Sequence, residues 1–571
     1  MVLKDICTGV NVHDFFVNDR CVAWKWTPLV METFRSFRND SVSIETRYLL
    51  SVKSLEISRT CCNVDVLRHE SDKVGLVIRS LDRSDGGVWK IQTWNLICEP
   101  DNADTYYNEI KLYRDLCCPD RPRSLLIFVN PYGGRRRAEA IYYSSVRPIF
   151  DLAGIRSKVI LTTHKNHCQK YILNEDLSPY DGVVSVGGDG LFSELLQGLL
   201  YRTRKDAKMP LYDAHKPFTT ELTPRLKIGL IPAGSTNAVI RSLHGTEDVE
   251  TAAIHIALGH NVGVDVLGVH DSSTKAFLRY TVSLLGYGFH GDILYPSERM
   301  RFLGPRRYDI AGAWRWLKFS SYRVRIAYLP STDSTPMDSN TCEAMCPICM
   351  KDIECEKAGN SSLAIDHAHQ SPDLIEPPSL THSHLPDYPL GNAWGEPGEV
   401  AASSMDDDLL TEVSESRDLV RNSENEDVEL PGGWRVTSGE FVAVNAFLIS
   451  CRCAKSPLGP APSAHLGDGY LDLILVRRCS RWKYLSYLVQ LTNKRKDRST
   501  QHLRMPFVEA HRVKAFRLQS LDNHGDPISN EKILPQKVSV WNVDGEILTY
   551  PNVICCVHRQ LIRLYGRGPE V

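Results

Sequence analysis

The stretch DGVVSVGGDGLFSELLQGLL, residues 181–200, joins a predicted strand to a predicted helix through a glycine-rich turn. Residues 181–186 are short and β-branched, as in a buried strand, and residues 191–200 are expected to form the helix. Backbone N–H groups at such a junction can bind phosphate, and the helix dipole favours the negative charge. The turn also holds one carboxylate, Asp189, at the position where a group that accepts a proton from an attacking hydroxyl belongs.

A single Gly-Gly-Asp-Gly turn is also typical of an ordinary strand-to-helix junction that is capped by an Asp. Two more glycine-bearing turns favour a ligand site. NPYGG at 130–134 follows the predicted strand 125–129, and PAGSTN at 232–237 follows the predicted strand 226–231. A further predicted strand, 158–161, lies between them, and strand–turn–helix units in series build a parallel sheet that binds ligands at the carboxyl ends of its strands. The three turns should therefore converge on one crevice, where only glycine lets a backbone come close to a phosphate.

The three turns resemble the catalytic domain shared by diacylglycerol kinases, sphingosine kinases and ceramide kinases. Further segments make the chain most similar to the ceramide kinase family. These segments are LLGYGFHGDI (284–293), SE (297–298), LG (303–304), RYD (307–309), a CxxxCxxC motif (342–349), AHLGDG (464–469) and DGE (544–546). The resemblance covers most of the chain outside roughly residues 355–430. It implies a membrane-recruited lipid kinase that converts ATP and ceramide into ADP and ceramide 1-phosphate.

Two alternatives stay open at the level of the sequence. A related enzyme would phosphorylate a sphingoid base or diacylglycerol, and a protein of another class would be a catalytically silent lipid-binding scaffold. The carboxylates Asp189, Glu194 and Asp544 are all present, which argues against the scaffold.

Phosphoryl transfer depends mostly on positioning and on charge neutralisation. Because the sequence contains no GxxxxGK[ST] loop, we expect Mg²⁺ and backbone N–H groups to neutralise the phosphates of ATP, with Ca²⁺ as the alternative cation that the resemblance implies. Family resemblance supplies the loop 162–166, Glu194 and the segment 544–546; charge complementation of the helix dipole is the alternative role of Glu194. The residues expected at the nucleotide and its metal are Asn130, Pro131, Gly133, Gly134, Thr162, Thr163, His164, Lys165, Asn166, Glu194, Gly234, Ser235, Thr236, Asp544, Gly545 and Glu546.

The residues expected at the substrate are Gly187, Gly188, Asp189, Gly190 and Asp292. Asp189 is the expected general base for a primary alcohol, a role that typically supplies about 10²–10⁴-fold in rate. Asp292 follows aromatic residues, which suits a lipid with a polar head and apolar tails. In sphingosine kinases the similar acid contacts the amine of the substrate, whereas the neutral amide of ceramide would form only a hydrogen bond with it. A helix N-cap is the alternative role of Asp292.

The CxxxCxxC motif consists of Cys342, Cys346 and Cys349. These thiols are candidate ligands of a structural Zn²⁺, completed by Cys355 or by the pair 451 and 453, and buried thiols without a metal are the alternative. The motif also resembles that of radical-SAM clusters, but its mid-chain place beside a polar insertion and outside any barrel argues against that chemistry.

Composition limits the class of protein. With 571 residues, 24% charged and 42% hydrophobic, the chain should hold about two to four globular domains. A net charge of −2 argues against nucleic acid as a partner. The first residues lack a hydrophobic signal core, so we expect the 17 cysteines to be reduced. No apolar run approaches membrane-spanning length, so we expect the protein to bind its lipid at a membrane surface or on a carrier.

The expected fold class is α/β plus all-β. Residues 1–118, with short alternating strands and a helix at 103–116, are by resemblance a pleckstrin-homology-like membrane-targeting domain; a packing domain without lipid affinity is the alternative. Residues 121–260 should be the parallel α/β ATP-binding domain, and 261–354 with 431–571 an antiparallel lipid-binding domain that closes the active-site cleft. Predicted strands outside the α/β domain are 21–24, 74–78, 88–94, 279–284, 441–445, 471–476 and 538–541.

Residues 355–430 and 481–496 have unusual compositions, which indicate disorder in the first segment and a candidate partner site in the second. Residues 355–430 are acidic and rich in Ser and Pro, which predicts a disordered insertion whose four histidines are either solvated or a metal tract. The aromatic segment 481–496 ends in basic residues; by resemblance it is a calmodulin site, and a core helix with a solvated basic end is the alternative. The expected location is cytoplasmic and peripheral to a membrane, the Golgi or plasma membrane by resemblance.

Overall fold

The computed structural model describes residues 10–17, 21–28, 41–45, 49–56, 74–84, 87–98, 100–134, 136–209, 217–300, 303–304, 306–331, 341–350, 428–429, 431–492, 500–528 and 538–570. The predicted insertion lies outside these ranges except for the short strand β15 (Val428–Glu429). Cys355, the four histidines of the insertion and the basic residues 494–496 also lie outside them.

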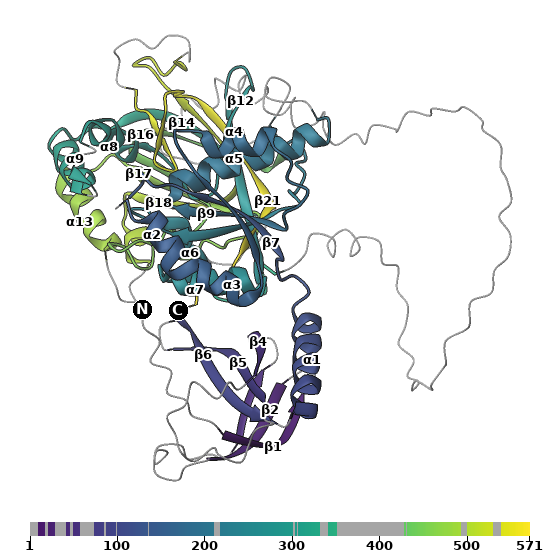
Figure 1. Ribbon diagram of the computed structural model, residues 1–571. Coiled ribbons are helices and arrows are strands. Elements are labelled where there is room, and N and C mark those ends of the chain that lie inside the picture. The colour runs from purple at the N-terminus through teal and green to yellow at the C-terminus, as the bar shows by residue number, and fades with distance from the viewer. Residues whose placement is uncertain are drawn as a thin grey trace, which may run out of the picture. The chain divides into compact units, whose positions relative to one another are not determined.

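The N-terminal strands form a six-stranded sheet in the order β3-β2-β1-β6-β5-β4 (Figure 1). They are β1 (Val10–Val17), β2 (Cys21–Pro28), β3 (Ser41–Glu45), β4 (Leu49–Glu56), β5 (Val74–Arg83) and β6 (Trp89–Cys98), followed by helix α1 (Pro100–Cys117). The predicted strands and helix of this region are therefore confirmed. Within the described residues β3 and β4 are the edges of the sheet, so the strands are not seen to close into a barrel.

A parallel sheet in the order β10-β9-β7-β8 carries the three glycine-rich turns. Its strands are β7 (Ser124–Val129), β8 (Arg156–Leu161), β9 (Gly182–Gly187) and β10 (Lys227–Pro232), within two residues of the predicted bounds. Every residue of β7 and β9 is buried, as expected for parallel strands that are covered on both faces.

Helices cover both faces of this sheet (Figure 1). Leu126 and Phe128 pack with α4 (His167–Asn174) and α5 (Asp189–Asp206), whereas Leu125 and Ile127 pack with α3 (Arg147–Ala153) and α7 (Val249–Leu258). Alternate residues of a strand point to opposite faces of the sheet, so β7 contributes side chains to two separate hydrophobic cores. The remaining helical segments of this part are α2 (Ala138–Ile141), the π-helical turn Tyr142–Val146 and α6 (Ala238–His244).

The antiparallel strands continue the same sheet. The long strand β21 (Val553–Tyr565) pairs in parallel with β10 at Ile228 and Leu564, and antiparallel with β11 and β18. The other strands are β11 (Asn261–Asp271), β12 (Phe277–Thr281), β13 (Leu284–Gly288), β14 (Tyr322–Pro330), β16 (Arg435–Phe447), β17 (Leu471–Arg477), β18 (Val508–Ser520), β19 (Trp541–Val543) and β20 (Glu546–Leu548). The helices here are α8 (Phe289–Arg299), α9 (Arg306–Leu317) and α13 (Arg481–Leu491), with 3₁₀ turns at Pro431–Gly433 and Gln501–Arg504.

Two predicted strands of this part needed correction. The strand expected at 279–284 is divided into β12 and β13, because the backbone N–H groups of Val282 and Ser283 bind the carboxylate of Asp544 instead of a neighbouring strand. The strand expected at 538–541 is displaced to Trp541–Val543. None of the helices within the described ranges combines the length and apolar character that crossing a bilayer requires.

The glycine-rich turns meet at the carboxyl ends of β7, β9 and β10. A Cβ atom added to Gly234 would lie 2.4 Å from the Cα of Gly188, and one added to Gly134 would lie 2.5 Å from the carbonyl oxygen of Ala233. Such distances are shorter than real Cβ contacts, so the three backbones touch where a side chain would separate them. The expected convergence of the turns is therefore observed.

This contact predicts that Gly234→Ala destabilises the protein, because two backbones must move apart to admit the methyl group. We expect a loss of about 1–3 kcal/mol in the free energy of unfolding, the usual cost of overpacking. The matched control is Gly190→Ala in the same region, where an added Cβ meets nothing within 4 Å. Because Gly190 is helical, this control should gain up to about 1 kcal/mol. Equal thermal stability of the two variants would contradict the close contact.

Candidate active site

Asn130 shapes the turn that follows β7. Its side-chain oxygen accepts hydrogen bonds from the backbone N–H groups of Tyr132 (3.0 Å) and Gly133 (3.1 Å), which is an Asx turn. The backbone N–H of Asn130 donates to the carbonyl oxygen of Val186 (3.1 Å) at the end of β9. These bonds fix the first turn against the second, and Pro131 of the first turn is half-buried.

Asp189 begins helix α5, but its carboxylate caps a different helix. The two carboxylate oxygens accept hydrogen bonds from the backbone N–H groups of Ala238 (3.1 Å) and Val239 (3.3 Å), at the start of α6. The N-cap residue of α5 is Gly188, and no side chain caps that helix. Asp189 therefore does not cap its own helix, and it ties the second turn to the third.

The surroundings of Asp189 raise the pKa of its carboxyl group above the ordinary value. Burial is the main cause, and the N–H donors of Ala238 and Val239 oppose it; Asp544 and Glu247 add smaller increases through their charges. A carboxylate with a raised pKa holds a proton better than a free one, which is the property that a general base needs. The third turn itself is held by Asn237, whose side-chain oxygen accepts the N–H of Gly234 (3.0 Å).

Ser235 and Thr236 are exposed at the end of β10. The neighbouring Gly187 is the last residue of β9, and its carbonyl oxygen accepts the backbone N–H of Ala233 (2.9 Å). The third turn thus presents exposed hydroxyl groups above a backbone that is fixed to the second turn, as a phosphate-binding surface requires.

Glu194 lies near the start of α5 and reaches the N-terminus of α4. Burial raises the pKa of its carboxyl group, and hydrogen bonds from the backbone N–H groups of Asn166 and Cys168 lower it in part. One carboxylate oxygen, Oε2, is buried without a hydrogen-bond partner. Because carboxylate oxygens are the ligands that Mg²⁺ prefers, this oxygen fits a hard cation.

The loop 162–166 is exposed beyond Thr162, which is buried against β7 through a hydrogen bond from its backbone N–H to the carbonyl oxygen of Val129 (2.9 Å). The hydroxyl of Thr163 and the ring of His164 are in hydrogen-bond contact (3.0 Å). Lys165 forms an ion pair with Glu546 (3.4 Å), so this loop contacts the DGE segment from the far end of the sequence.

The DGE segment is held by side chains on both sides. The carboxylate of Asp544 accepts the N–H of Ser283 (3.2 Å), the hydroxyl of Ser283 (2.6 Å), the N–H of Leu284 (3.1 Å) and the N–H of Val282 (3.3 Å). Three of these donors bind Oδ1 and one binds Oδ2, so Asp544 holds the start of β13 and keeps one acceptor site on Oδ2. Gly545 follows in a left-handed turn (φ 85°) and donates its N–H to Asn542.

Glu546 lies beyond this turn, and Arg279, a residue that sequence reasoning missed, is its strongest partner. Arg279 pairs with Glu546 (3.1 Å) and donates to the hydroxyl of Ser193 (2.9 Å) on α5. Burial raises the pKa of the Glu546 carboxyl group, but Arg279 and Lys165 together hold it below the ordinary value. No motif signals Arg279, because its role depends on the pairing of β12 beside α5 and not on local sequence.

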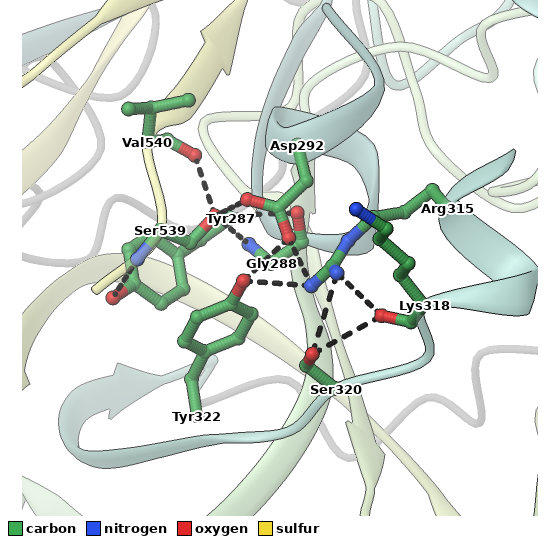
Figure 2. A network of polar contacts seen from close by, with 9 residues as sticks. All are labelled: Tyr287, Gly288, Asp292, Arg315, Lys318, Ser320, Tyr322, Ser539 and Val540. Atoms are coloured by element: carbon green, nitrogen blue, oxygen red, sulfur yellow. Dashed lines mark hydrogen bonds and ion pairs between the residues drawn. The ribbon is translucent and has the colours of Figure 1, made fainter. Parts of the chain in front are cut away.

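Asp292 lies on α8 and belongs to a network of polar contacts with residues of neighbouring elements (Figure 2). Its Oδ2 atom accepts the hydroxyl of Tyr322 (2.6 Å) and pairs with Arg315 (2.6 Å), and its Oδ1 atom accepts the hydroxyl of Ser539 (2.7 Å). The N-cap of α8 is Gly288, so Asp292 is not the helix cap that was the alternative. Arg315 also donates to the carbonyl oxygen of Lys318 (2.6 Å), which fixes its position.

Three acceptor sites of the Asp292 carboxylate are used by these partners. A carboxylate has about four such sites, so one site on Oδ1 remains for a ligand. Nearby, burial raises the pKa of Tyr287 to about 12, and its hydroxyl is in hydrogen-bond contact with that of Ser520 (2.9 Å). The sequence indicated Asp292 but gave no signal for Arg315, Tyr322 or Ser539.

The three cysteines of the CxxxCxxC motif are buried together with His465. The sequence predicted Cys355 or the pair Cys451 and Cys453 as their partners. His465 was missed, although it lies in the AHLGDG segment that supported the family resemblance.

Helix α13 is the described part of the aromatic segment that, by resemblance, was expected to be a calmodulin site, with a core helix as the alternative. Tyr484 and Tyr487 are fully buried in the core, whereas Trp482 and Val489 are exposed. A partner that wrapped around the helix would have to remove both tyrosines from the core. The described part of the segment is therefore a core helix with one exposed face.

Comparisons with known proteins agree with this arrangement. Residues 124–269 match the family described as Diacylglycerol kinase catalytic domain, and residues 403–570 match the Ceramide kinase C-terminal domain. The chain is 36% identical to ceramide kinase of Homo sapiens over 468 residues, which cover 79% of this chain and 74% of that protein. It is 28% identical to ceramide kinase of Arabidopsis thaliana (79% and 74% covered) and 26% identical to the ceramide kinase-like protein of Homo sapiens (98% and 89% covered). From its site, its two matching domains and these relatives, the chain belongs to the ceramide kinase family.

Proposed function

We propose that this chain transfers the γ-phosphoryl group of ATP to the primary hydroxyl of ceramide and releases ADP and ceramide 1-phosphate. The observation that carries the proposal is the place of Asp189. Its carboxylate lies where two glycine-rich turns touch, and burial raises its pKa. The similar relatives include the ceramide kinases of Homo sapiens and Arabidopsis thaliana, and both matching domains are named for lipid kinases.

The nucleotide phosphates would bind above the three turns, where backbone N–H groups can approach them without side chains between. The loop 162–166, which is exposed beyond Thr162, and Glu546 would hold the adenosine side. Mg²⁺, when bound, would supply neutralisation of phosphate charge, and Glu194, with its unpartnered oxygen, is the residue that would hold it. Ca²⁺ prefers the same oxygen ligands and is the alternative cation.

Asp189 would accept the proton of the ceramide hydroxyl while the oxygen attacks phosphorus. The N–H donors of Ala238 and Val239 hold its carboxylate in one orientation, so the acceptor is positioned before the substrate binds. Such positioning lowers the entropic part of the barrier.

Asp292 would accept a hydrogen bond from the polar head of ceramide at its remaining site on Oδ1. Its ion pair with Arg315 favours a neutral head over a charged one, because the negative charge is already compensated. A sphingoid base carries an ammonium group, which would compete with Arg315 for the same carboxylate. This contact is the reason to prefer ceramide over sphingosine.

We further propose that the protein meets ceramide at a membrane surface, through a face formed by α8, α9 and α13. The large apolar side chains exposed on these helices are Tyr295, Ile310, Trp314, Leu317, Trp482 and Val489. Cations lie over two of these rings, Lys318 over Trp314 (4.6 Å) and Arg299 over Tyr295 (5.4 Å). Aromatic rings with flanking cations are typical of the boundary between lipid and water. The same helices carry Asp292 and Arg315, so the face adjoins the proposed head-group site.

The N-terminal sheet would add membrane affinity if it acts as the pleckstrin-homology-like unit that the sequence suggests, at the cytoplasmic side of the Golgi or plasma membrane. It also has a structural role. The side-chain N–H of Trp89 donates to Glu570 (2.8 Å), and the backbone N–H of Trp89 donates to the hydroxyl of Thr251 (2.9 Å) at the start of α7. Removal of this sheet would deprive the buried Glu570 and Thr251 of their hydrogen bonds from Trp89, so truncation does not test membrane targeting alone.

The substrate assignment predicts a clear order among lipids presented in the same vesicles. With labelled ATP, phosphorylation of ceramide should be at least about tenfold faster than that of sphingosine or diacylglycerol, the ratio that corresponds to about 1.4 kcal/mol. Equal or faster phosphorylation of sphingosine would contradict the proposed role of the Asp292–Arg315 pair. Absence of phosphorylation of all three lipids by folded protein would favour the scaffold alternative.

The base assignment predicts that Asp189→Asn lowers kcat by about 10²–10⁴-fold with little change in ATP affinity, because the amide retains the size of the side chain but cannot accept the proton. The matched control is Asp248→Asn. Asp248 also caps a helix through its carboxylate, which accepts the backbone N–H of Thr251 (2.8 Å), but it lies outside the site.

Both variants should lose similar small amounts of stability, and only Asp189→Asn should lose activity. A kcat near that of the wild type for Asp189→Asn would remove Asp189 from the mechanism.

A further inference from the structure

Four side chains outside the active site form a closed group of metal-ligand type. They are Cys342, Cys346 and Cys349 from the loop 341–350, and His465 from the connection between β16 and β17. Their ligand atoms all lie within 4.8 Å of one another, and each residue is at most 7% exposed. Three thiols and one imidazole that converge in the interior need an explanation that hydrophobic packing does not give.

Three of the distances within the group are those expected between ligands at the corners of a tetrahedron. The sulfur atoms of Cys342 and Cys349 are 3.7 Å apart, and the Nδ1 atom of His465 lies 3.4 Å from the sulfur of Cys346 and 3.8 Å from that of Cys349. Ligands about 2.1–2.3 Å from a central ion at tetrahedral angles are about 3.5–3.8 Å from one another. A disulfide would need about 2.05 Å between two sulfurs, so these thiols are not paired in that way.

The loop that supplies the cysteines has no helix or strand of its own. Residues 341–350 form only turns and irregular backbone, yet all three cysteines are buried. A loop of this kind has few backbone bonds to hold it, and ligation is the usual way to fix such a segment.

The surroundings fit a site with one net negative charge, which three thiolates and a neutral imidazole would give around a divalent ion. Arg452 is buried, and burial lowers the pKa of its guanidinium, whereas the charges of the nearby Cys342 and Glu343 raise it in part. A buried cation beside the thiolates would offset the excess charge.

Contacts around the group connect it to the end of the chain. The side-chain amide of Gln560, on β21, donates to the carbonyl oxygens of Cys349 (3.2 Å) and Gly467 (2.9 Å). The backbone N–H of Met345 donates to the carbonyl oxygen of Arg567 (2.6 Å). The cluster therefore joins three segments that are far apart in the sequence.

We propose that Cys342, Cys346, Cys349 and His465 bind one structural Zn²⁺ that fastens the loop 341–350 to the 464–469 segment and to β21. Zn²⁺ is the common ion for a closed tetrahedral set of three sulfurs and one nitrogen. Four protein ligands leave no coordination position open for a substrate, and the site takes no part in phosphoryl transfer. The zinc proposal therefore does not depend on the proposed function.

The test is elemental analysis of the full-length protein, purified without added metal. We expect about one zinc per chain, and a strong zinc chelator should lower the temperature of thermal unfolding by several degrees, with recovery on addition of Zn²⁺. Folded wild-type protein that contains no zinc, and whose unfolding temperature does not respond to Zn²⁺, would overturn the proposal.

Variants separate ligation from packing. Cys346→Ser and His465→Ala should lose zinc and stability, whereas His465→Cys should retain zinc because four thiolates also form a tetrahedral site. The control is Cys555→Ala, which removes an equally buried thiol of β21 outside the cluster and should retain the full zinc content. If Cys555→Ala lost as much zinc as Cys346→Ser, the loss would reflect general unfolding and the assignment would fail.

Replacement of the ion by Co²⁺ gives a readout that packing cannot imitate. Wild-type protein loaded with Co²⁺ should show thiolate-to-metal charge-transfer bands and the strong visible bands of tetrahedral cobalt, and His465→Ala should change them. An octahedral, weakly coloured Co²⁺ spectrum in the wild type would contradict a buried site with three sulfur ligands.

Discussion

The direct contact between the backbones of Gly188 and Gly234 is the constraint on which the site depends. It brings the turns after β9 and β10 together, and the carboxylate of Asp189 then reaches the N-terminus of α6. Glu194 makes a similar connection to the N-terminus of α4. Helix α5 thus orients α6 through the carboxylate of Asp189 and α4 through that of Glu194. The groups that would bind phosphate and accept a proton are arranged by the same few contacts that hold the sheet ends in place.

Local sequence was sufficient for the parts of the fold that depend on local patterns. The buried strands β7, β9 and β10 and their glycine-rich turns were predicted within a few residues, because a parallel strand covered on both faces is a short apolar run and a close backbone approach requires glycine. Asp189 and Asp292 were also singled out from sequence, since each follows a distinctive glycine-containing segment, and their roles stay predictions. The family resemblance extended these predictions to Glu194 and to the DGE segment.

Contacts between distant segments were not predictable. Arg279, Arg315 and Ser539 carry no local signal, because their partners come from strands and helices up to several hundred residues away. The same is true of His465, which joins a cysteine motif more than a hundred residues earlier. The division of the strand predicted at 279–284 follows from a carboxylate near the C-terminus. The parallel and antiparallel parts of the large sheet are joined through β21, the last strand.

Backbone amide hydrogen exchange with and without ATP and Mg²⁺ reports on the three turns themselves. Nucleotide that binds across them should slow exchange in three separate segments, 130–134, 187–190 and 233–237, together with the loop 162–166. Exchange in the N-terminal sheet and in residues 341–350 should stay unchanged. Protection confined to one turn, or found only outside these segments, would contradict a nucleotide site built from three converging turns.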